Sequence, residues 1–264
     1  MIVKKEHITV HEWQSLKAFT AARIALGRTG VAIPLKEVLN FKMAHAFARD
    51  AVHTLLDEEK LIHDLQVFQL PVFNLQSKAI DRNEYLQRPD WGRILNEQSF
   101  IEIQQAKGNY DIAFVIADGL SATAINKHAV PILQLIIPQL QQQLKIAPLI
   151  IAQQARVGIG DEIGYLINTK LIVVLIGERP GLSSFDSMGA YITYAPTIGL
   201  TDESRNCISN IRPEGLTYDM AAQKMIYLIQ QSLQLKLSGV ELKDESSTDN
   251  IKHPESLNFQ DAVE

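Results

Sequence analysis

The stretch Lys170–Gly177, KLIVVLIG, decides the fold, because it is a short run of apolar, mostly β-branched residues that ends in a glycine. Such a run, followed by turn residues, is typical of a strand buried on both faces of a parallel sheet. Asp111–Ala117 (DIAFVIA) and Leu149–Gln153 (LIIAQ) predict two further strands of this kind, and Ala190–Tyr194 (AYITY) predicts a fourth.

Helices are predicted between and after these strands. Asp161–Asn168 predicts one helix, and Asp219–Leu237 carries an apolar stripe typical of a long amphipathic helix. The alternation of strand and helix favours a parallel sheet with right-handed crossovers. The expected fold class is therefore α/β, a parallel sheet flanked by helices.

The helix that follows the first strand has a clear start and an interrupted middle. Ser121 or Thr123 can cap it. Pro131 and Pro138 each lack a backbone N–H and restrict the preceding residue. We therefore expect two or three short helical pieces here.

The N-terminal region is expected to be helical over 12–66, with a loop at 27–34. Its apolar residues recur at spacings of three and four, which makes one helical face: Leu39, Met43, Ala46, Phe47, Ala51 and Leu55. Residues 68–92 predict a long irregular connection, a type of segment that is often functional or interfacial. The polar, aperiodic residues 245–264 predict a flexible tail.

Composition excludes several classes of protein. The chain has 264 residues, a net charge of -5 and a single cysteine, Cys207, which excludes a disulfide-stapled scaffold. No long basic run is present, so nucleic-acid binding by phosphate neutralisation is not expected. The apolar runs are far shorter than the roughly 20 residues of a membrane helix, so no membrane partner is expected. The first thirty residues lack the apolar core of a signal peptide, which favours a cytoplasmic protein.

Polar loops follow three of the predicted strands: residues 118–121, 156–161 and 177–184. Because ligands of open parallel sheets bind at the carboxyl ends of the strands, we expect these loops to meet around a ligand. Glycines and hydroxyls in them suit a ligand that carries a nucleotide.

Gly158–Gly164 (GIGDEIG), with Glu178 after the next strand, is similar to a dinucleotide-binding fingerprint. The last glycine comes one residue too late for that fingerprint. Asp161 and Glu162 also place negative charge at the helix start, where a pyrophosphate would lie. A stand-alone NAD-dependent oxidoreductase is therefore kept as an alternative function, and a scaffold without any cofactor as another.

No catalytic or metal site is predicted. Gly119–Ser121 and Gly181–Ser183 do not complete the Gly-x-Ser-x-Gly motif of a nucleophilic serine. His45 and His53 share a predicted helical face with Arg49, whose cation opposes a metal.

Several long and uncommon stretches resemble the small (light) subunit of ethanolamine ammonia-lyase. They run in order over most of the chain, from about Arg23 to Asp244, and are Ala22–Gly30 (ARIALGRTG), Tyr85–Asp90 (YLQRPD), Ala117–Asn126 (ADGLSATAIN), Gly177–Ser187 (GERPGLSSFDS) and Thr201–Gly215 (TDESRNCISNIRPEG).

The resemblance implies an adenosylcobalamin-dependent enzyme that converts ethanolamine to acetaldehyde and ammonia through a radical mechanism. It implies that the catalytic side chains lie on a large subunit, and that hetero-oligomers form from large–small pairs. It implies three regions: an N-terminal helical region with an irregular connection (1–104), a Rossmann-like cobalamin-binding domain (105–244) and the tail. Some relatives are enclosed in a bacterial microcompartment, so this enclosure is a further expectation.

The resemblance also implies three cobalamin contacts. They are Val157 in Ala-Arg-Val-Gly, Glu178 in Gly-Glu-Arg-Pro and Cys207 in Arg-Asn-Cys-Ile-Ser-Asn. The chain lacks the Asp-x-His-x-x-Gly motif with which many cobalamin proteins supply a histidine to cobalt. We therefore expect the cofactor to keep its own dimethylbenzimidazole on cobalt.

Overall fold

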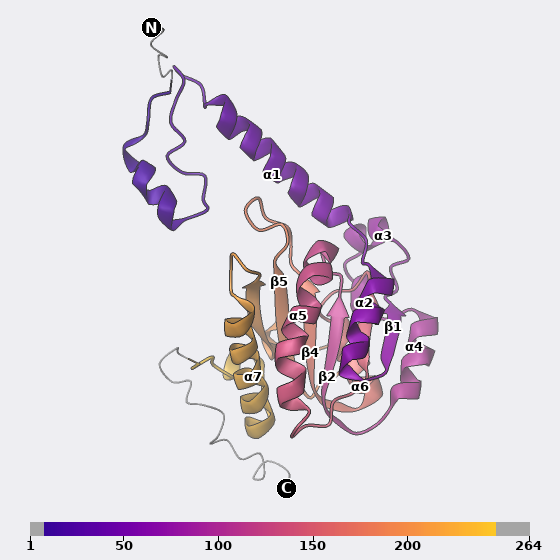
Figure 1. The fold of residues 1–264 in the computed structure, drawn as a ribbon. Helices are drawn as coiled ribbons and strands as arrows, with labels where there is room; N and C mark the ends of the chain where they lie inside the picture. Colours follow the sequence, from indigo (N-terminus) through magenta and orange to yellow (C-terminus); the bar gives the residue numbers. More distant parts are fainter. Residues whose placement is uncertain (1–7, 247–264) are drawn as a thin grey trace.

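The computed structural model describes residues 8–246 and has an α/β architecture built on one six-stranded mixed sheet (Figure 1). The strand order is β1-β3-β2-β4-β5-β6. The strands are β1 (Val72–Gln76), β2 (Tyr110–Ala117), β3 (Leu149–Gln153), β4 (Thr169–Gly177), β5 (Met188–Tyr194) and β6 (Arg205–Ile211). The four strands predicted from apolar runs are thus confirmed as β2, β3, β4 and β5.

The expectation of a wholly parallel sheet is wrong. Strands β1, β3, β2 and β4 are parallel, but β5 pairs antiparallel with β4, and β6 pairs antiparallel with β5. The segment 178–187 between β4 and β5 contains no helix. A parallel neighbour needs a crossover of about a dozen or more residues, so this shorter connection returns the chain as an antiparallel strand.

Two edge strands, β1 and β6, were not predicted. β1 lies inside the stretch expected to be irregular, and only Leu75 of its five residues is buried. β6 buries Arg205, Ile208 and Ile211 and turns polar residues outward. Neither strand has the apolar run that predicts a buried strand, and each forms because a neighbouring strand pairs with it.

Helices cover both faces of the sheet. The α-helices are α1 (Leu35–His53), α2 (Glu58–Leu65), α3 (Arg82–Gln87), α4 (Glu97–Ile103), α5 (Ala122–Leu140), α6 (Ile159–Ile167) and α7 (Tyr218–Leu235). The 3-10 helices are η1 (Glu12–Phe19), η2 (Gln66–Phe68), η3 (Trp91–Arg93), η4 (Gln104–Ala106), η5 (Asp202–Ser204) and η6 (Gly239–Glu241). One core lies between the sheet and α2, α5 and α7, and a second lies between the sheet and α4 and α6.

Helix α5 is continuous, so the prediction that proline breaks it is wrong. Ser121 caps it as predicted, since its side chain accepts the N–H of Ala124. Pro131 and Pro138 lie inside the helix, away from its most buried side. An interior proline costs about 3 kcal/mol, and full burial of one large aliphatic side chain contributes about 1.5–3 kcal/mol. Helix α5 buries several large aliphatic side chains, and together they offset the cost of the two prolines. Among them are Ile125, Ile132, Leu133, Ile136 and Ile137.

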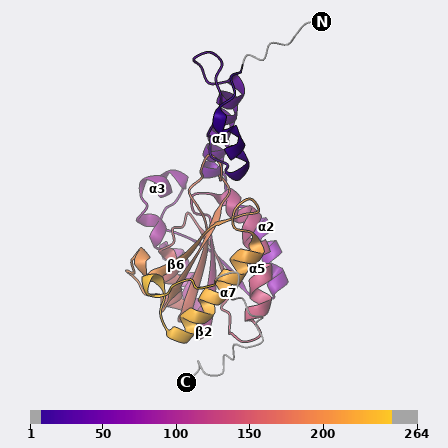
Figure 2. The same cartoon turned by 90° about the vertical axis from the view of Figure 1, so that its left-hand side faces the viewer.

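The N-terminal residues 8–53 form an arm that projects from the body of the molecule (Figures 1 and 2). The arm is only partly helical: η1 is a 3-10 helix, and α1 follows an irregular segment. The apolar face predicted for α1 is exposed, with Leu39 at 55%, Met43 at 54% and Phe47 at 46%, and only Ala51 is buried. Most of this surface is exposed, although the Phe47 ring packs against the Phe185 ring, with centroids 5.4 Å apart.

Across residues 8–246, no helix combines the length and the apolar character needed to span a membrane. The predicted tail lies outside the described residues from 247 onward.

Candidate ligand pocket

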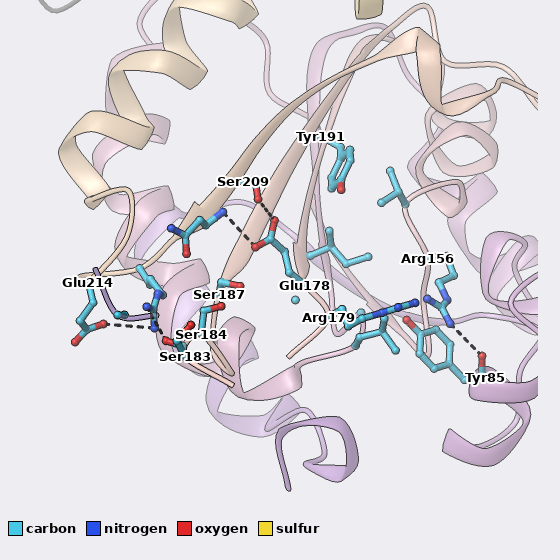
Figure 3. Close-up of a pocket in the computed structure, with 18 residues that line it drawn as sticks. Tyr85, Arg156, Glu178, Arg179, Ser183, Ser184, Ser187, Tyr191, Ser209 and Glu214 are labelled. Carbon is cyan, nitrogen blue, oxygen red and sulfur yellow. Dashed lines mark hydrogen bonds and ion pairs between the residues drawn. The ribbon is translucent and has the colours of Figure 1, made fainter. Parts of the chain in front are cut away.

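A pocket of about 680 Å³ opens where the carboxyl ends of β2 and β4 meet (Figure 3). The loops that follow β2, β3 and β4 all line it, through Gly119, Val157 and Glu178 among others. The structure thus brings together the three loops that the sequence placed at one edge of the sheet. The end of β6 and Ala21 of the N-terminal arm complete the wall.

The loops after β2 and β4 meet closely because these strands are neighbours in the sheet. The Leu120 N–H donates to the Gly177 carbonyl oxygen at 2.9 Å. Gly119 has φ +59°, and a Cβ there would overlap the backbone of Gly177. Only glycine provides both the left-handed conformation and the space. The shape of this wall therefore depends on a glycine at position 119.

Asp118 connects the loop after β2 with the loop after β3 through hydrogen bonds. Its carboxylate accepts the N–H groups of Gly119 at 2.9 Å, Gln154 at 3.0 Å and Ala155 at 2.9 Å, and the Arg82 Nη1 lies 3.6 Å away. Burial raises the pKa of this carboxyl to about 6, although Arg82 and the three N–H donors oppose that shift. Asp118 was missed as a site residue; its only signal was its position at the end of a buried strand.

Glu178 lies in the pocket and is oriented by β6. The Ser209 hydroxyl donates to its Oε1 at 2.5 Å, and the Asn210 N–H donates to its Oε2 at 3.2 Å (Figure 3). A carboxylate has about four acceptor positions, so further donors from a ligand can still bind.

Val157 also lines the pocket, whereas Cys207 is not among its lining residues. Cys207 is an exposed thiol on β6 and pairs across the sheet with Tyr191, which does line the pocket. Burial raises the pKa of the Cys207 thiol, and a hydrogen bond with Tyr191 opposes this. The three sequence-predicted contacts therefore lie in one region, with Cys207 outside the pocket wall, two residues before Ser209 on β6.

The β4–β5 loop is held over the pocket by charged groups. The Asp186 carboxylate accepts from the Lys127 Nζ at 2.8 Å and from the Arg212 Nη1 at 3.4 Å, and the Arg212 Nη2 donates to the Ser183 carbonyl oxygen at 3.0 Å. Arg212 therefore stabilises this loop.

The glycines of the apparent dinucleotide fingerprint serve packing. A Cβ at Gly160 would strike Val174 of β4, and a Cβ at Gly164 would strike Pro196. Helix α6 therefore lies close against the sheet because these positions lack side chains.

The acidic residues of that motif are engaged inside the protein. Asp161 binds both Nη atoms of the buried Arg205, at 2.5 and 2.7 Å, and Glu162 accepts the Leu95 N–H at 2.6 Å. A pyrophosphate at this helix start would meet two carboxylates. The NAD-dependent alternative is not supported.

Other candidate groups have structural partners. The Ser121 hydroxyl donates to the Phe185 carbonyl oxygen, and His128 hydrogen-bonds to the Tyr218 hydroxyl at 2.6 Å. Among residues 8–246, no group of three or more His, Cys, Asp and Glu side chains could hold a metal ion.

Fold and pocket together define an α/β protein with a polar ligand pocket at the carboxyl ends of its sheet and an arm with exposed apolar side chains. The family model described as "Ethanolamine ammonia-lyase light chain (EutC)" matches residues 10–243. The chain belongs to this family.

Relatives named ethanolamine ammonia-lyase small subunit are similar over nearly their full length. The one from Pseudomonas fluorescens is 49% identical, over 91% of this chain and 89% of the relative. The one from Azotobacter vinelandii is 48% identical, over 90% of each chain. This chain is accordingly a subunit of a lyase.

Proposed function

We propose that this chain binds adenosylcobalamin in the pocket described above, at an interface with the large subunit of ethanolamine ammonia-lyase. The complex would convert ethanolamine to acetaldehyde and ammonia. The observation that carries the proposal is the family match over residues 10–243, in a chain whose loops after β2, β3 and β4 share one polar pocket.

The residues present suit this cofactor. Adenosylcobalamin carries many amide groups and a nucleotide tail. The pocket offers both hydrogen-bond acceptors and hydrogen-bond donors for such groups: Glu178, Ser183, Ser184, Ser209, Asn210 and Arg156. The Nε atoms of Arg156 and Arg212 are buried without a hydrogen-bond partner, and both arginines line the pocket. When bound, the cofactor supplies the radical that abstracts hydrogen from ethanolamine.

This chain's own residues would bind and orient the cofactor. Glu178, already fixed by β6, would accept hydrogen bonds from amide or ribose groups. Val157 would supply packing and backbone contacts at the pocket wall. Cys207 would contribute from β6, beside Tyr191. Asp118 would keep the Gly119 and Ala155 backbones in place beneath them.

The large subunit is the proposed partner because relatives of this chain are named small subunits. The exposed apolar side chains of the arm, such as Leu39 and Met43, fit such an interface, since large exposed apolar patches mark association sites. We place the substrate-binding catalytic residues on the large subunit. The partner's cover and this chain's pocket would together exclude water from the reactive radical.

Two finer expectations belong to this proposal. The dimethylbenzimidazole of the cofactor stays on cobalt, and a spectrum that shows a protein histidine nitrogen on cobalt would contradict this. The complex works in the cytoplasm, with enclosure in a bacterial microcompartment as a further possibility to test by localisation of the tagged chain.

Co-expression tests the proposal directly. The chain is expressed with and without the matching large subunit, adenosylcobalamin and ethanolamine are added, and acetaldehyde is followed. Activity that requires both chains and the cofactor is expected. Failure of the two chains to co-purify, with no activity, would refute the proposal, and co-purification without any effect of the cofactor would favour a scaffold.

A further inference from the structure

Charge is segregated within the pocket. Figure 3 shows Glu178 turned toward Ser209, while the guanidinium groups of Arg156 and Arg179 point toward each other. The Glu178 carboxylate is thus engaged with β6 and the other carboxylate of the lining, Glu214, lies 4.0 Å from Arg212. Two cations converge from the loops after β3 and β4.

Neither of these two arginines has an anionic partner among residues 8–246. The ion pairs found there include neither Arg156 nor Arg179. The Arg156 Nε is buried without a hydrogen-bond partner, and the Arg156 Nη2 donates only at 3.5 Å to the Tyr85 carbonyl oxygen. By contrast, Arg212 in the same pocket is neutralised by Asp186.

The Arg156 guanidinium is held in position by an aromatic ring. Its Cζ lies 4.3 Å from the centroid of Tyr85, whose hydroxyl donates to the Ala155 carbonyl oxygen at 3.3 Å. Two converging like charges repel, and a bound anion would relieve this repulsion. A guanidinium presents its donors in a rigid fork that matches phosphate oxygens.

We propose that Arg156 and Arg179 form an anion subsite that takes a phosphate group. Its non-bridging oxygens can accept hydrogen bonds from two converging guanidinium groups. Resting on the proposed function, we assign this group to the phosphodiester of the cofactor's nucleotide tail. Free phosphate offers the same type of anionic acceptor oxygen and is the other source to be tested.

The test measures ligand binding by spectral titration of the complex between this chain and the large subunit. Two ligands are compared: hydroxocobalamin, which carries the phosphodiester, and cobinamide, which lacks it. Arg179→Met alters an exposed side chain, and Arg156→Met keeps the apolar stem that packs near Tyr85. Arg156→Lys keeps the charge without the fork, and Arg88→Met, outside the pocket, is the matched control.

Each methionine variant should weaken hydroxocobalamin binding by about tenfold to a hundredfold, the range for a hydrogen bond to a charged group. Cobinamide binding should stay unchanged, and Arg156→Lys should be intermediate. A second arm measures whether inorganic phosphate, against chloride at equal ionic strength, raises the unfolding temperature of the wild-type chain but not of the variants.

The outcomes separate the two proposals. A loss confined to hydroxocobalamin supports the subsite with the cofactor as its source. Phosphate stabilisation that the variants abolish, with no difference between the two corrinoids, supports the subsite with free phosphate as its source. The absence of both effects would overturn the proposed subsite. A wild-type complex that binds neither corrinoid would refute the proposed function, and the phosphate arm would then decide the subsite by itself.

Discussion

Replacing Arg205 with methionine should destabilise this protein severely, because it would leave a buried carboxylate without its counter-ion. The Arg205 side chain is 1% exposed and that of Asp161 is 5% exposed. The two Nη atoms bind the two Oδ atoms at 2.5 and 2.7 Å, and Nη1 lies 3.3 Å from the Thr193 hydroxyl. The pair joins the start of α6 to β6.

Removal of one partner from a buried ion pair typically costs about 3–5 kcal/mol, since the remaining charge loses its compensation. We expect a loss of this size in the free energy of unfolding of Arg205→Met. The double variant Arg205→Met/Asp161→Leu should recover most of it, because an apolar pair of similar volume is often nearly neutral.

Urea unfolding of the full chain, followed by circular dichroism and by fluorescence, measures both variants. Coincident transitions by the two probes justify a single free energy. Arg93→Met is the matched control: Arg93 contacts Asp202 at 3.4 Å, as Arg205 does, but its side chain is 45% exposed. Such a surface pair contributes about 0–1 kcal/mol. A loss below 1 kcal/mol in Arg205→Met, or no recovery in the double variant, would refute the reasoning.

Four other perturbations have expected outcomes. Because the folded pKa of Asp118 is raised from 3.8 to about 6, the stability that it contributes is present below pH 3.8 and is lost as pH rises through 6. The free energy of unfolding of the wild type relative to Asp118→Asn should therefore fall by about 2.4 kcal/mol between pH 4 and pH 8, and a flat difference would be contrary to this assignment. Gly119→Ala should cost several kcal/mol through steric overlap, whereas Gly30→Ala, at φ +64° with open space, should cost only about 1 kcal/mol in urea titrations, and equal losses would contradict the close approach. Glu178→Ala should weaken cobalamin affinity more than it changes the KM for ethanolamine, and unchanged cofactor affinity would remove this residue from the site. Met43→Ser should weaken co-purification with the large subunit while it changes the unfolding of the isolated chain by less than about 1 kcal/mol, since the side chain is 54% exposed, and intact association would exclude this face.

The pocket could be predicted in outline from the sequence. Apolar runs located β2, β3 and β4, and parallel strands place their carboxyl ends at one edge, so Val157 and Glu178 were expected to lie near each other. The structural role of Asp118 could not be predicted, because its three N–H donors come from two loops that are distant in sequence. The absence of an ion-pair partner for Arg156 and Arg179 among residues 8–246 likewise depends on which carboxylates lie nearby in space.

The fingerprint around Gly160 shows the limit of local patterns. Spacing alone allowed a dinucleotide site, but the Asp161 and Glu162 side chains are engaged by Arg205 and the Leu95 backbone. Glycines that allow the close approach of a pyrophosphate and glycines that allow a helix to pack closely on a sheet produce the same sequence pattern.

The sequence by itself determined the α/β class, the positions of the central strands and the family, because these depend on local apolar runs and on long motifs such as Gly177–Ser187. Tertiary structure decided the antiparallel direction of β5 and β6, the continuity of α5 across two prolines and the exposure of the α1 face. Each of these is set by contacts between segments remote in the chain. Strand pairing, burial and the neutralisation of charge are properties of the folded arrangement, and no local stretch of residues specifies them.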